Sequence, residues 1–303
     1  MTDLIIIGSG ISGMSAALYA LRSGKSVLIL EKENVGGQIS FSPKVENFPS
    51  VLSISGADLS EKIFEQVTNL GAQFELEDVS KIEKEGNVFT VTTDYSEHKS
   101  KAVIIASGVK NRRTGIDGET ELIGKGVSYC ALCDGAFYAG EEVALIGDAN
   151  TAVQYVLHLS NYCKKVSVFT LFDKFFAEDY LIKALRAKSN VEVTHEVSLS
   201  AFETHEDELS GLTFKKKDGS IFTHDTKAVF IAIGQVPDNE KYASLVELDK
   251  SGYIVAGETC ETKTPGLYVA GDCRTKKIRQ LVTASADGAV AATLACTYID
   301  CLK

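Results

Sequence analysis

Two cysteines three positions apart are the residues of this chain with the most evident chemistry. Cys130 and Cys133 form a C-x-x-C motif, and Asp134 follows directly. Such a pair can close as a disulfide or hold two electrons as thiols, which is the chemistry of thiol–disulfide exchange. A carboxyl group beside the pair could protonate a departing thiolate. The motif therefore indicates a dithiol redox centre with Asp134 as its candidate acid, although a solvated turn residue is the alternative for Asp134.

Two other interpretations of the cysteine pair compete with redox chemistry. A structural zinc site needs four ligands, and the histidines, at positions 98, 158, 195, 205 and 224, do not supply the required spacing. A buried inert pair is the third interpretation, which the polar neighbours Ser128 and Asp134 disfavour. We expect the remaining cysteines to be small buried side chains. They stand in or beside apolar segments at positions 163, 260, 273, 296 and 301.

A glycine-rich turn near the N-terminus could hold a dinucleotide. Gly8, Gly10 and Gly13 form G-x-G-x-x-G directly after the apolar run 4–7, and Glu31 closes the next apolar run. In such a turn the first glycine makes the bend, the second admits a pyrophosphate, and the third packs helix on strand. The acidic side chain is placed to accept hydrogen bonds from an adenosine ribose. Because all parts stand in register, dinucleotide binding is favoured over a purely structural turn.

Two further positions could contact the same ligand. Gly36, Gly37 and Gln38 follow the second apolar run, where backbone amides could reach a phosphate or a flavin ring. A tight loop is the alternative. Asp272 follows the run GLYVAG, where it could bind a hydroxyl of a ribityl chain or cap a helix.

The segment around the first turn recurs once in the chain. Residues 4–32 recur in character within residues 143–172, at a constant offset of 139 residues. Each copy is typical of a βαβ unit, with a buried strand, a turn, an amphipathic helix and a second buried strand. Further apolar runs end in glycine, as in parallel sheets whose carboxyl edges meet a ligand. Residues 87–94 alternate instead and predict an antiparallel hairpin.

Length and charge limit the function classes. A chain of 303 residues favours two domains. The net charge of −10 argues against binding to nucleic acid or to an anionic membrane. No run of 18 apolar residues is present, and the first residues lack a basic region, so we expect no membrane span and a cytoplasmic location.

Taken in order along the chain, these motifs resemble low-molecular-weight thioredoxin reductases. The resemblance covers nearly the whole chain. It rests also on Glu46-Asn47-Phe48-Pro49, Ala106-Ser107-Gly108, Gly271-Asp272, Arg279-Gln280, Thr283-Ala284 and Asp287-Gly288. It implies an α/β fold of two doubly wound, Rossmann-like domains of the FAD/NAD(P)-binding type. The FAD domain would be discontinuous, residues 1–113 and 242–303, with an inserted nucleotide-binding-like domain at 114–241 that carries the C-x-x-C motif.

The resemblance also implies FAD as cofactor, thioredoxin as partner and a homodimer. Electrons would pass from a donor to FAD, then to the dithiol and then to a protein disulfide. Cys130 would attack the partner and Cys133 would face the flavin. The cofactor-binding residues, from the motifs and the resemblance together, are Gly8, Gly10, Gly13, Glu31, Gly36, Gly37, Gln38, Asn47, Gly108, Gly271, Asp272, Arg279 and Gln280.

The second βαβ copy departs from a nucleotide site. Asp148 and Ala149 follow Gly147, so a carboxylate would repel phosphate and a methyl group would crowd the backbone. NADPH-using relatives carry a His-Arg-Arg run for the 2′-phosphate, and here the matching residues are Thr170-Leu171-Phe172. In these losses the chain resembles a subgroup of thioredoxin reductases that ferredoxin reduces.

Three phenylalanines follow the missing arginines. Phe172, Phe175 and Phe176 would share one face if their segment were helical. Core packing is one interpretation, and a cover over the vacated nucleotide site is the other.

The sequence therefore predicts an FAD-dependent thioredoxin reductase with reduced ferredoxin as the favoured donor. One alternative is an ordinary NADPH-dependent reductase, and another is a non-catalytic flavin redox sensor. The NADPH alternative needs a phosphate grip from residues such as Arg112, Arg113 or Lys174. An acidic ferredoxin would need a local basic patch, for which the candidates are Lys276, Lys277 and Arg279.

Overall fold

The computed structural model describes residues 1–42 and 45–302, and the chain forms two compact units. Unit 1 comprises Met1–Lys110 and Val236–Lys303, and unit 2 comprises Asn111–Gln235. The junctions expected after residues 113 and 241 lie three and six residues further along the chain. At the junction, β7 (Lys110–Asn111) pairs with β16 (Gln235–Val236), so the two polar connections form a short ladder.

Unit 1 is built on a seven-stranded sheet of order β3-β2-β1-β6-β5-β4, with β17 paired to β6. Strands β1, β2, β3, β6 and β17 run parallel, and β4 and β5 add an antiparallel hairpin at one side. The antiparallel pairing of residues 88–93 confirms the expectation from the alternating sequence. The strands are β1 (Thr2–Ile7), β2 (Val27–Glu31), β3 (Gln73–Leu76), β4 (Val79–Glu85), β5 (Val88–Thr93), β6 (Glu97–Ile105) and β17 (Leu267–Val269).

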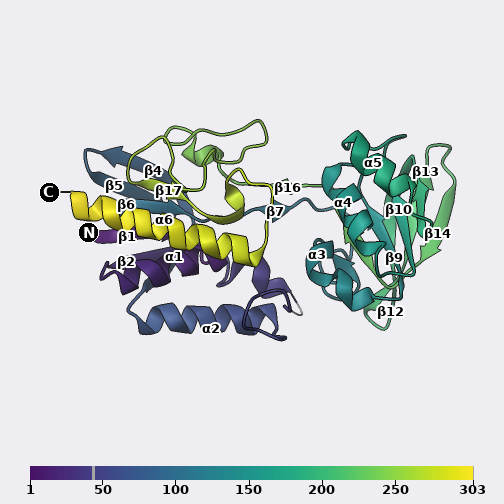
Figure 1. The fold of residues 1–303 in the computed structure, drawn as a ribbon, viewed down its shortest axis with the longest axis horizontal. Helices are drawn as coiled ribbons and strands as arrows, with labels where there is room; N and C mark the ends of the chain where they lie inside the picture. The colour runs from purple at the N-terminus through teal and green to yellow at the C-terminus, as the bar shows by residue number, and fades with distance from the viewer. Residues whose placement is uncertain (43–44, 303) are drawn as a thin grey trace. The chain divides into compact units, whose positions relative to one another are not determined.

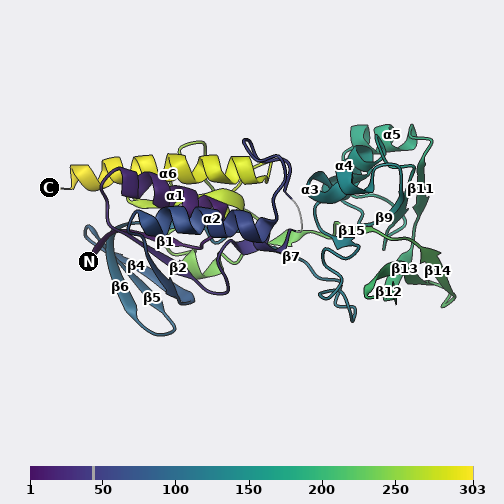
Figure 2. The same ribbon diagram turned by 90° about the horizontal axis from the view of Figure 1, so that it is seen from below.

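Three helices cover this sheet: α1 (Ile11–Arg22), α2 (Gly56–Asn69) and α6 (Leu281–Cys301). Figures 1 and 2 show α6, in yellow, lying along α1. Small residues allow the close approach, because a Cβ atom on Gly288 would lie 2.1 Å from the Ser12 carbonyl oxygen. Short 3-10 helices complete the unit: η1 (Gly37–Phe41), η3 (Glu240–Tyr242) and η4 (Gly271–Cys273).

Within the described residues, α6 is the one helix long and apolar enough to cross a membrane by length and composition alone. Its residues Ala291, Ala292 and Ala295 are fully buried in the same core cluster as Ala16 and Ala17 of α1. The core of a folded domain requires such apolar residues. We therefore treat α6 as a core helix.

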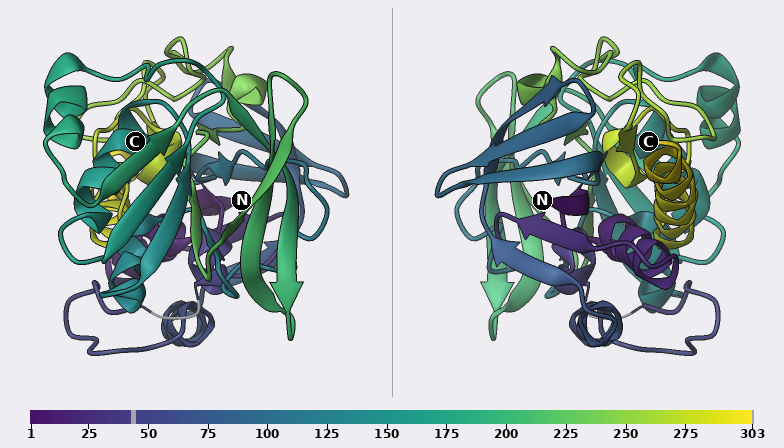
Figure 3. Two further views of the ribbon diagram at one scale, coloured as in Figure 1. Left: turned by 90° about the vertical axis from the view of Figure 1, so that its right-hand side faces the viewer. Right: turned by 90° about the vertical axis from the view of Figure 1, so that its left-hand side faces the viewer.

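Unit 2 contains a five-stranded parallel sheet of order β11-β10-β9-β15-β8. Helices α4 and α5 pack on one face, where Val153 and Leu181 join a core with Val166 and Val168. The antiparallel sheet β12-β13-β14 covers the other face (Figure 3), where Phe214 stacks on Phe169 with ring centroids 4.1 Å apart. The strands are β8 (Val127–Ser128), β9 (Glu142–Ile146), β10 (Lys165–Phe169), β11 (Val191–Thr194), β12 (Val197–His205), β13 (Glu208–Lys216), β14 (Ile221–Asp225) and β15 (Val229–Ile231). The helices are α3 (Ala131–Asp134), η2 (Gly135–Tyr138), α4 (Asn150–Leu159) and α5 (Asp179–Arg186).

The two predicted βαβ units are present, and their strands pair in the same register. In unit 1, Leu4 of β1 pairs with Val27 of β2. In unit 2, Val143 of β9 pairs with Val166 of β10, so both partners keep the offset of 139 residues. The expected fold class, two doubly wound α/β domains, is confirmed.

Candidate active site

The first glycine turn joins β1 to α1. Two of its glycines are required by close backbone contacts, and the third has open space beside it. Gly8 has φ +104°, and a Cβ atom there would lie 2.4 Å from the Ala106 carbonyl oxygen. A Cβ atom on Gly13 would lie 1.9 Å from the Gly8 carbonyl oxygen. Among the described residues, a Cβ atom on Gly10 would meet only the Gly36 carbonyl oxygen within 4 Å, at 3.9 Å. Gly10 is therefore the position at which the backbone is open to a ligand.

The second glycine pair lies against the first turn. Gly36 forms a parallel bridge with Gly10, and its amide donates to the Ser9 carbonyl oxygen at 3.1 Å. Gly36 and Gly37 both have positive φ, and a Cβ atom on Gly36 would lie 2.2 Å from Ser60 Oγ. The N-cap of α1 is Gly10, which has no side chain to cap the helix, so the first amides of α1 are available to an anion. The structure thus brings both glycine clusters to the N-terminus of one helix.

Glu31 lies at the end of β2, and its carboxylate contacts the glycine turn at Ser9. Its Oε2 accepts hydrogen bonds from Ser9 N at 2.7 Å and Ser9 Oγ at 2.8 Å. Its Oε1 accepts hydrogen bonds from the amides of Lys32 and Glu33, at 2.9 and 3.0 Å. The buried carboxylate therefore holds the turn in addition to its expected ribose contact. Sequence reasoning missed Ser9, whose only signal is its place between two glycines.

Asp272 belongs to η4, beside the same helix end. Gly271 has φ +82°, and a Cβ atom on it would lie 2.5 Å from Ser12 Oγ of α1. The Asp272 Oδ1 atom is buried and has no hydrogen-bond partner within residues 1–42 and 45–302. Burial raises the pKa of Asp272, while Lys276 and Arg279 act in the opposite direction. A buried carboxylate oxygen without a donor fits the hydroxyl of a bound ribityl chain. The capping alternative is wrong, because Ala270 occupies the N-cap of η4.

A buried ionic cluster supports the Asp272 turn from α6. Asp287 Oδ2 accepts hydrogen bonds from Gly271 N at 3.0 Å and from Lys276 Nζ at 2.8 Å. Arg274 donates to both carboxylate oxygens of Asp287, at 2.8 Å each. Although burial alone would raise it, these bonds lower the pKa of Asp287. From the sequence, Asp287 is recognisable only as part of a motif, and no role for it could be predicted.

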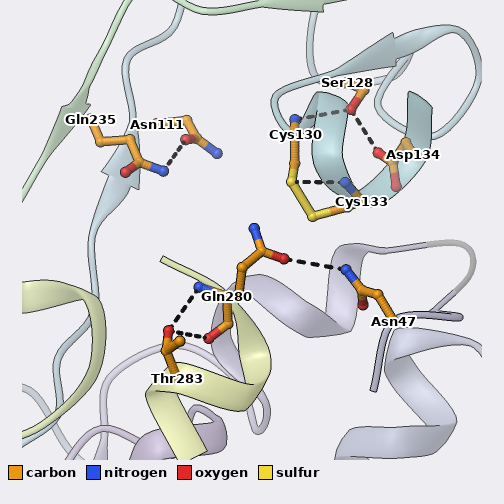
Figure 4. Close-up of a disulfide and its surroundings, with 9 residues drawn as sticks. All are labelled: Asn47, Asn111, Ser128, Cys130, Cys133, Asp134, Gln235, Gln280 and Thr283. Carbon is orange, nitrogen blue, oxygen red and sulfur yellow. Dashed lines mark hydrogen bonds between the residues drawn. A yellow bond between two sulfur atoms is a disulfide. The ribbon is translucent and has the colours of Figure 1, made fainter. Parts of the chain in front are cut away.

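The other expected flavin contacts also lie in unit 1. Gln38 Nε2 donates to the Val109 carbonyl oxygen at 3.1 Å, and Asn47 Nδ2 donates to Gln280 Oε1 at 3.2 Å (Figure 4). Gly108 has φ +65°. Gln280 also forms a capping box with Thr283 at the start of α6.

The basic patch suggested for an acidic partner is wrong. Lys276 is buried against Asp287, with its side chain 7% exposed. The Arg279 guanidinium lies 4.2 Å from the Tyr253 ring centroid and donates to the Asp272 carbonyl oxygen at 3.3 Å. Only Lys277 of the three is exposed.

In unit 2, Cys130 and Cys133 are joined as a disulfide at the start of α3 (Figure 4). The Cys133 amide donates to Cys130 Sγ at 3.2 Å. Both cysteines are partly exposed, so the buried inert pair is not what the structure shows. Their disulfide is the oxidised form of an exchange couple and differs from a zinc-bound dithiolate.

Asp134 lies beside this disulfide, and among the described residues its carboxyl group has one hydrogen-bond partner. Its Oδ2 accepts a hydrogen bond from Ser128 Oγ at 2.6 Å, and its Oδ1 is buried without a partner in the described part of the chain. Burial raises the pKa of Asp134, and the bond from Ser128 acts in the opposite direction. A raised pKa favours the protonated carboxyl that an acid requires.

The turn of the second βαβ copy is occupied by the chain itself. Phe176 forms a bridge with Ala149 at the start of α4, and its amide donates to the Asp148 carbonyl oxygen at 2.7 Å. The Glu178 amide donates to Asn150 Oδ1 at 2.8 Å. Burial raises the pKa of Asp148.

The strand end after β10 is also closed. Thr170 Oγ1 donates to the Phe172 carbonyl oxygen at 2.7 Å and lies 2.7 Å from His195 Nδ1. The segment before α5 is not helical, so the single apolar face expected of three phenylalanines is wrong. Phe175 packs on the unit 2 core, whereas Phe172 and Phe176 are exposed and meet edge to face at 5.1 Å.

The remaining cysteines follow the expectation with one exception. Burial raises the pKa of Cys163, Cys260 and Cys273 to about 11, so these thiols are unreactive. Cys296 is buried as well, but Cys301, at the end of α6, is exposed.

Known proteins share this fold and these motifs. The chain matches the pyridine nucleotide-disulphide oxidoreductase family over residues 2–288. It is 36% identical to the thioredoxin reductase of Bacillus subtilis over 99% of this chain and 96% of that protein. It is 38% identical to a 34.2 kDa protein in the rubredoxin operon of Clostridium pasteurianum, over 98% and 97%. The crystal structure of thioredoxin reductase from Streptococcus pyogenes superposes with a TM-score of 0.95, at 34% identity and 99% and 98% coverage.

Fold, disulfide and glycine turn together define a flavin-dependent disulfide oxidoreductase. Within that class, the chain belongs to the low-molecular-weight thioredoxin reductase family. FAD is its cofactor, and the open turn at Gly10 and the Asp272 Oδ1 atom, which has no partner among the described residues, fit that group.

Proposed function

We propose that this protein is a thioredoxin reductase that takes its electrons from reduced ferredoxin and not from NADPH. Residues 1–113 and 242–303 would form the FAD domain, and residues 114–241 the inserted domain with the dithiol. The observation that carries the choice of donor is the turn before α4, where Asp148, Ala149 and Phe176 stand in place of a phosphate site.

Residues of unit 1 would hold the cofactor. The α1 amides at Gly10, with Gly36 and Gly37, would bind the pyrophosphate, and Asp272 would accept a ribityl hydroxyl. The remaining contacts would come from Gly8, Gly13, Glu31, Gln38, Asn47, Gly108, Gly271, Arg279 and Gln280. Bound FAD supplies a two-electron carrier.

The dithiol of unit 2 would pass these electrons to thioredoxin. Cys130 would attack the partner disulfide, and Cys133 would then close the enzyme disulfide. Asp134 would give a proton to the departing sulfur, which its buried position favours.

The case against a nicotinamide donor is energetic. A hydrogen bond to a charged group contributes about 1.5 to 3 kcal/mol, so the loss of two arginines could cost about 3 to 6 kcal/mol. This corresponds to about two to four decades in affinity. The Asp148 carboxylate would repel a pyrophosphate, which NADH carries as well. Of the alternative phosphate ligands, Arg113 donates to Tyr129, whereas Lys174 lies over the ring of Phe176, beside the turn itself.

An anaerobic titration tests the donor. The purified holoenzyme is mixed with NADPH, NADH or photoreduced ferredoxin, and bleaching of the flavin is followed in parallel. We expect rapid bleaching by ferredoxin alone. Stoichiometric bleaching by micromolar NADPH would restore the NADPH-dependent alternative.

Substitution of the cysteines tests the route. Cys130→Ser and Cys133→Ser should each keep the yellow flavin and lose thioredoxin reduction, because only these two sulfurs form the exchange couple. Cys301→Ser is the matched control, since Cys301 is exposed and has no disulfide partner. If either single variant retained turnover, the chemistry would lie elsewhere. If the wild-type flavin were reduced but never reoxidised by any protein disulfide, the redox-sensor alternative would hold.

We further propose a cytoplasmic homodimer. Unit 1 has a groove of about 250 Å³ between α1, α6 and the loop with Phe48 and Pro49. Tyr19, Val282 and Val290 are exposed apolar residues on the same two helices. Sedimentation velocity with Tyr19→Glu, expected to favour the monomer, tests whether a second copy covers this surface.

A further inference from the structure

Ser128 connects the redox cysteines to the acid. It ends β8 and is 7% exposed. Its Oγ accepts a hydrogen bond from the Cys130 amide at 3.1 Å and donates one to Asp134 Oδ2 at 2.6 Å (Figure 4). One hydroxyl group thereby fixes the backbone of the first cysteine and the carboxyl group of the acid.

Among the described residues, the Asp134 carboxyl group accepts no hydrogen bond other than the one from Ser128. Its Oδ1 is buried without a partner, and no ion pair reaches it from the described residues. The titratable groups around it are two phenols, one imidazole and the Glu208 carboxyl group of β13, whose negative charge acts on the same Tyr138 phenol as that of Asp134. Tyr138 lies on η2, Tyr162 packs against Gly135 after α4, and His158 of α4 meets the Tyr162 ring at 5.3 Å. No cation therefore competes with Ser128 for control of this carboxyl group in that part of the chain.

We propose that Ser128 is a positioning residue of the dithiol centre: its hydroxyl bridges the Cys130 amide and the Asp134 carboxyl group and stabilises the carboxylate form. The proposal rests on the proposed dithiol function. Ser128 lies outside the C-x-x-C-D motif, which therefore does not predict a role for it. Without the hydroxyl, a carboxylate in this buried place has no donor and remains protonated to higher pH.

Asp134 must be an ionised carboxylate when Cys130 attacks and a protonated acid when the second substrate sulfur leaves. When the reduced enzyme meets a disulfide, the Cys130 thiol gives its proton to Asp134 while its sulfur bonds to the substrate. The substrate disulfide breaks, and Cys133 then attacks Cys130 Sγ to form the enzyme disulfide. The substrate sulfur displaced by Cys130 takes the proton of the Cys133 thiol. The substrate sulfur displaced from Cys130 by Cys133 leaves with the proton from Asp134. Two electrons and two protons thus move from enzyme to substrate.

The first test titrates Asp134 directly and needs no turnover. Difference infrared spectra of the oxidised holoenzyme follow the carboxyl stretch with pH, and Asp134→Asn identifies the band. Loss of a hydrogen bond to a charged group should raise the midpoint by about one pH unit or more in Ser128→Ala. Ser128→Thr keeps the hydroxyl and should keep the wild-type midpoint. An unchanged midpoint in Ser128→Ala would overturn the proposal.

The second test follows the reaction with a small aromatic disulfide after stoichiometric reduction by dithionite, which avoids any choice of donor. The acid limb of the rate should move to higher pH in Ser128→Ala by the same amount as the infrared midpoint, and should stay in place in Ser128→Thr. The role of Ser128 is contradicted if the acid limb of the pH–rate profile does not move in Ser128→Ala, or if it is still present in Asp134→Asn. If wild-type enzyme does not react with the disulfide at all, the proposed function fails, while the infrared titration still decides on Ser128. An unchanged flavin spectrum and melting temperature confirm that the variants fold.

Discussion

The two βαβ copies share a backbone and differ in what faces their helix ends. Both keep parallel strands in the same register, and both keep the first glycine against a neighbouring strand end. A Cβ atom on Gly8 or on Gly147 would lie 2.4 Å from a carbonyl oxygen. Beyond that point the copies diverge. Before α1 lie the open Gly10 and the Asp272 turn, whereas before α4 lie Ala149 and the backbone of Phe176.

This difference separates residues that the fold requires from residues that a ligand requires. Gly8 and Gly147 are constrained by strand contacts, and such positions persist in both copies. Gly10 has open space around it, and its counterpart is alanine. A glycine motif alone therefore does not identify a nucleotide site, and the open position does.

The strongest way to break the comparison is to rebuild the second turn. Asp148→Gly and Ala149→Gly combined with Leu171→Arg and Phe172→Arg should raise NADPH affinity by about two to four decades, or about 3 to 6 kcal/mol. The measurement is flavin bleaching at graded NADPH. The two glycine changes alone are the control and should favour NADH and NADPH equally. A rebuilt variant that binds NADPH no better than wild type contradicts the assignment.

The second prediction concerns the support of the first turn. Asp287→Ala leaves Arg274 and Lys276 buried without their shared carboxylate and should lower the free energy of unfolding by about 3 to 5 kcal/mol. FAD affinity should fall too, because Gly271 loses its acceptor. Chemical denaturation and flavin fluorescence measure the two effects. Glu142→Gln, in an exposed pair with Lys164, is the control. Equal behaviour of the two variants would show that the cluster has no special role.

The third prediction compares equivalent positions at the start of the two copies. Asp3 stands in β1 where Glu142 stands in β9. Burial alone would raise the pKa of Asp3, but the bonds from Lys101 and Ser26 lower it to about 2 from 3.8. Stability from Asp3 is therefore present above pH 3.8 and is lost as the pH falls towards 2.

Asp3→Asn should accordingly cost about 2 kcal/mol at neutral pH and progressively less as the pH falls through about 2. Glu142→Gln should show no measurable cost at either pH, because its pair is in solvent. Denaturation across this pH range measures both. A pH-independent loss in Asp3→Asn would mean that packing and not charge is responsible.

The smallest change sharpens the distinction at Gly10. Gly10→Ala adds a methyl group in open space at φ −66°, so the apoprotein should keep its stability. The methyl group would face the pyrophosphate, and we expect FAD affinity to fall at least about tenfold, or about 1.4 kcal/mol. Flavin fluorescence gives the affinity. Gly13→Ala, whose new Cβ atom would clash at 1.9 Å, should instead destabilise the apoprotein itself.

Much of the fold follows from the sequence because its signals are local. The strand and helix of each copy depend on apolar periodicity, and the offset of 139 residues already fixes the correspondence between β1 and β9. The same holds for the disulfide, since Cys130 and Cys133 are close in sequence.

Contacts between distant segments could not be predicted. The bond from Gly271 to Asp287 depends on how η4 meets α6, and the placement of Phe176 depends on a nonhelical loop. The basic patch failed for the same reason, because the sequence shows the charge of Lys276 but not its burial. The roles of Ser9 and of Ser128, which the sequence shows only as a polar neighbour of the cysteines, could not be predicted, because serine is common and only its neighbours in space give it a role.

The packing of α6 on α1 has a consequence for synthesis of the chain. Strand β17 and helix α6 complete unit 1, yet they lie at residues 267–301, after the whole of unit 2. Translation proceeds at about 5 to 20 residues per second, so the 66 residues from Gln235 to Cys301 take about 3 to 13 seconds. During that interval unit 2 can be complete on the ribosome, while α1 and β6 still expose the apolar surface that the C-terminal segment covers. The nascent chain is therefore expected to be most vulnerable to aggregation in its N-terminal third, and the turn with Asp272 is absent until this last segment has been made.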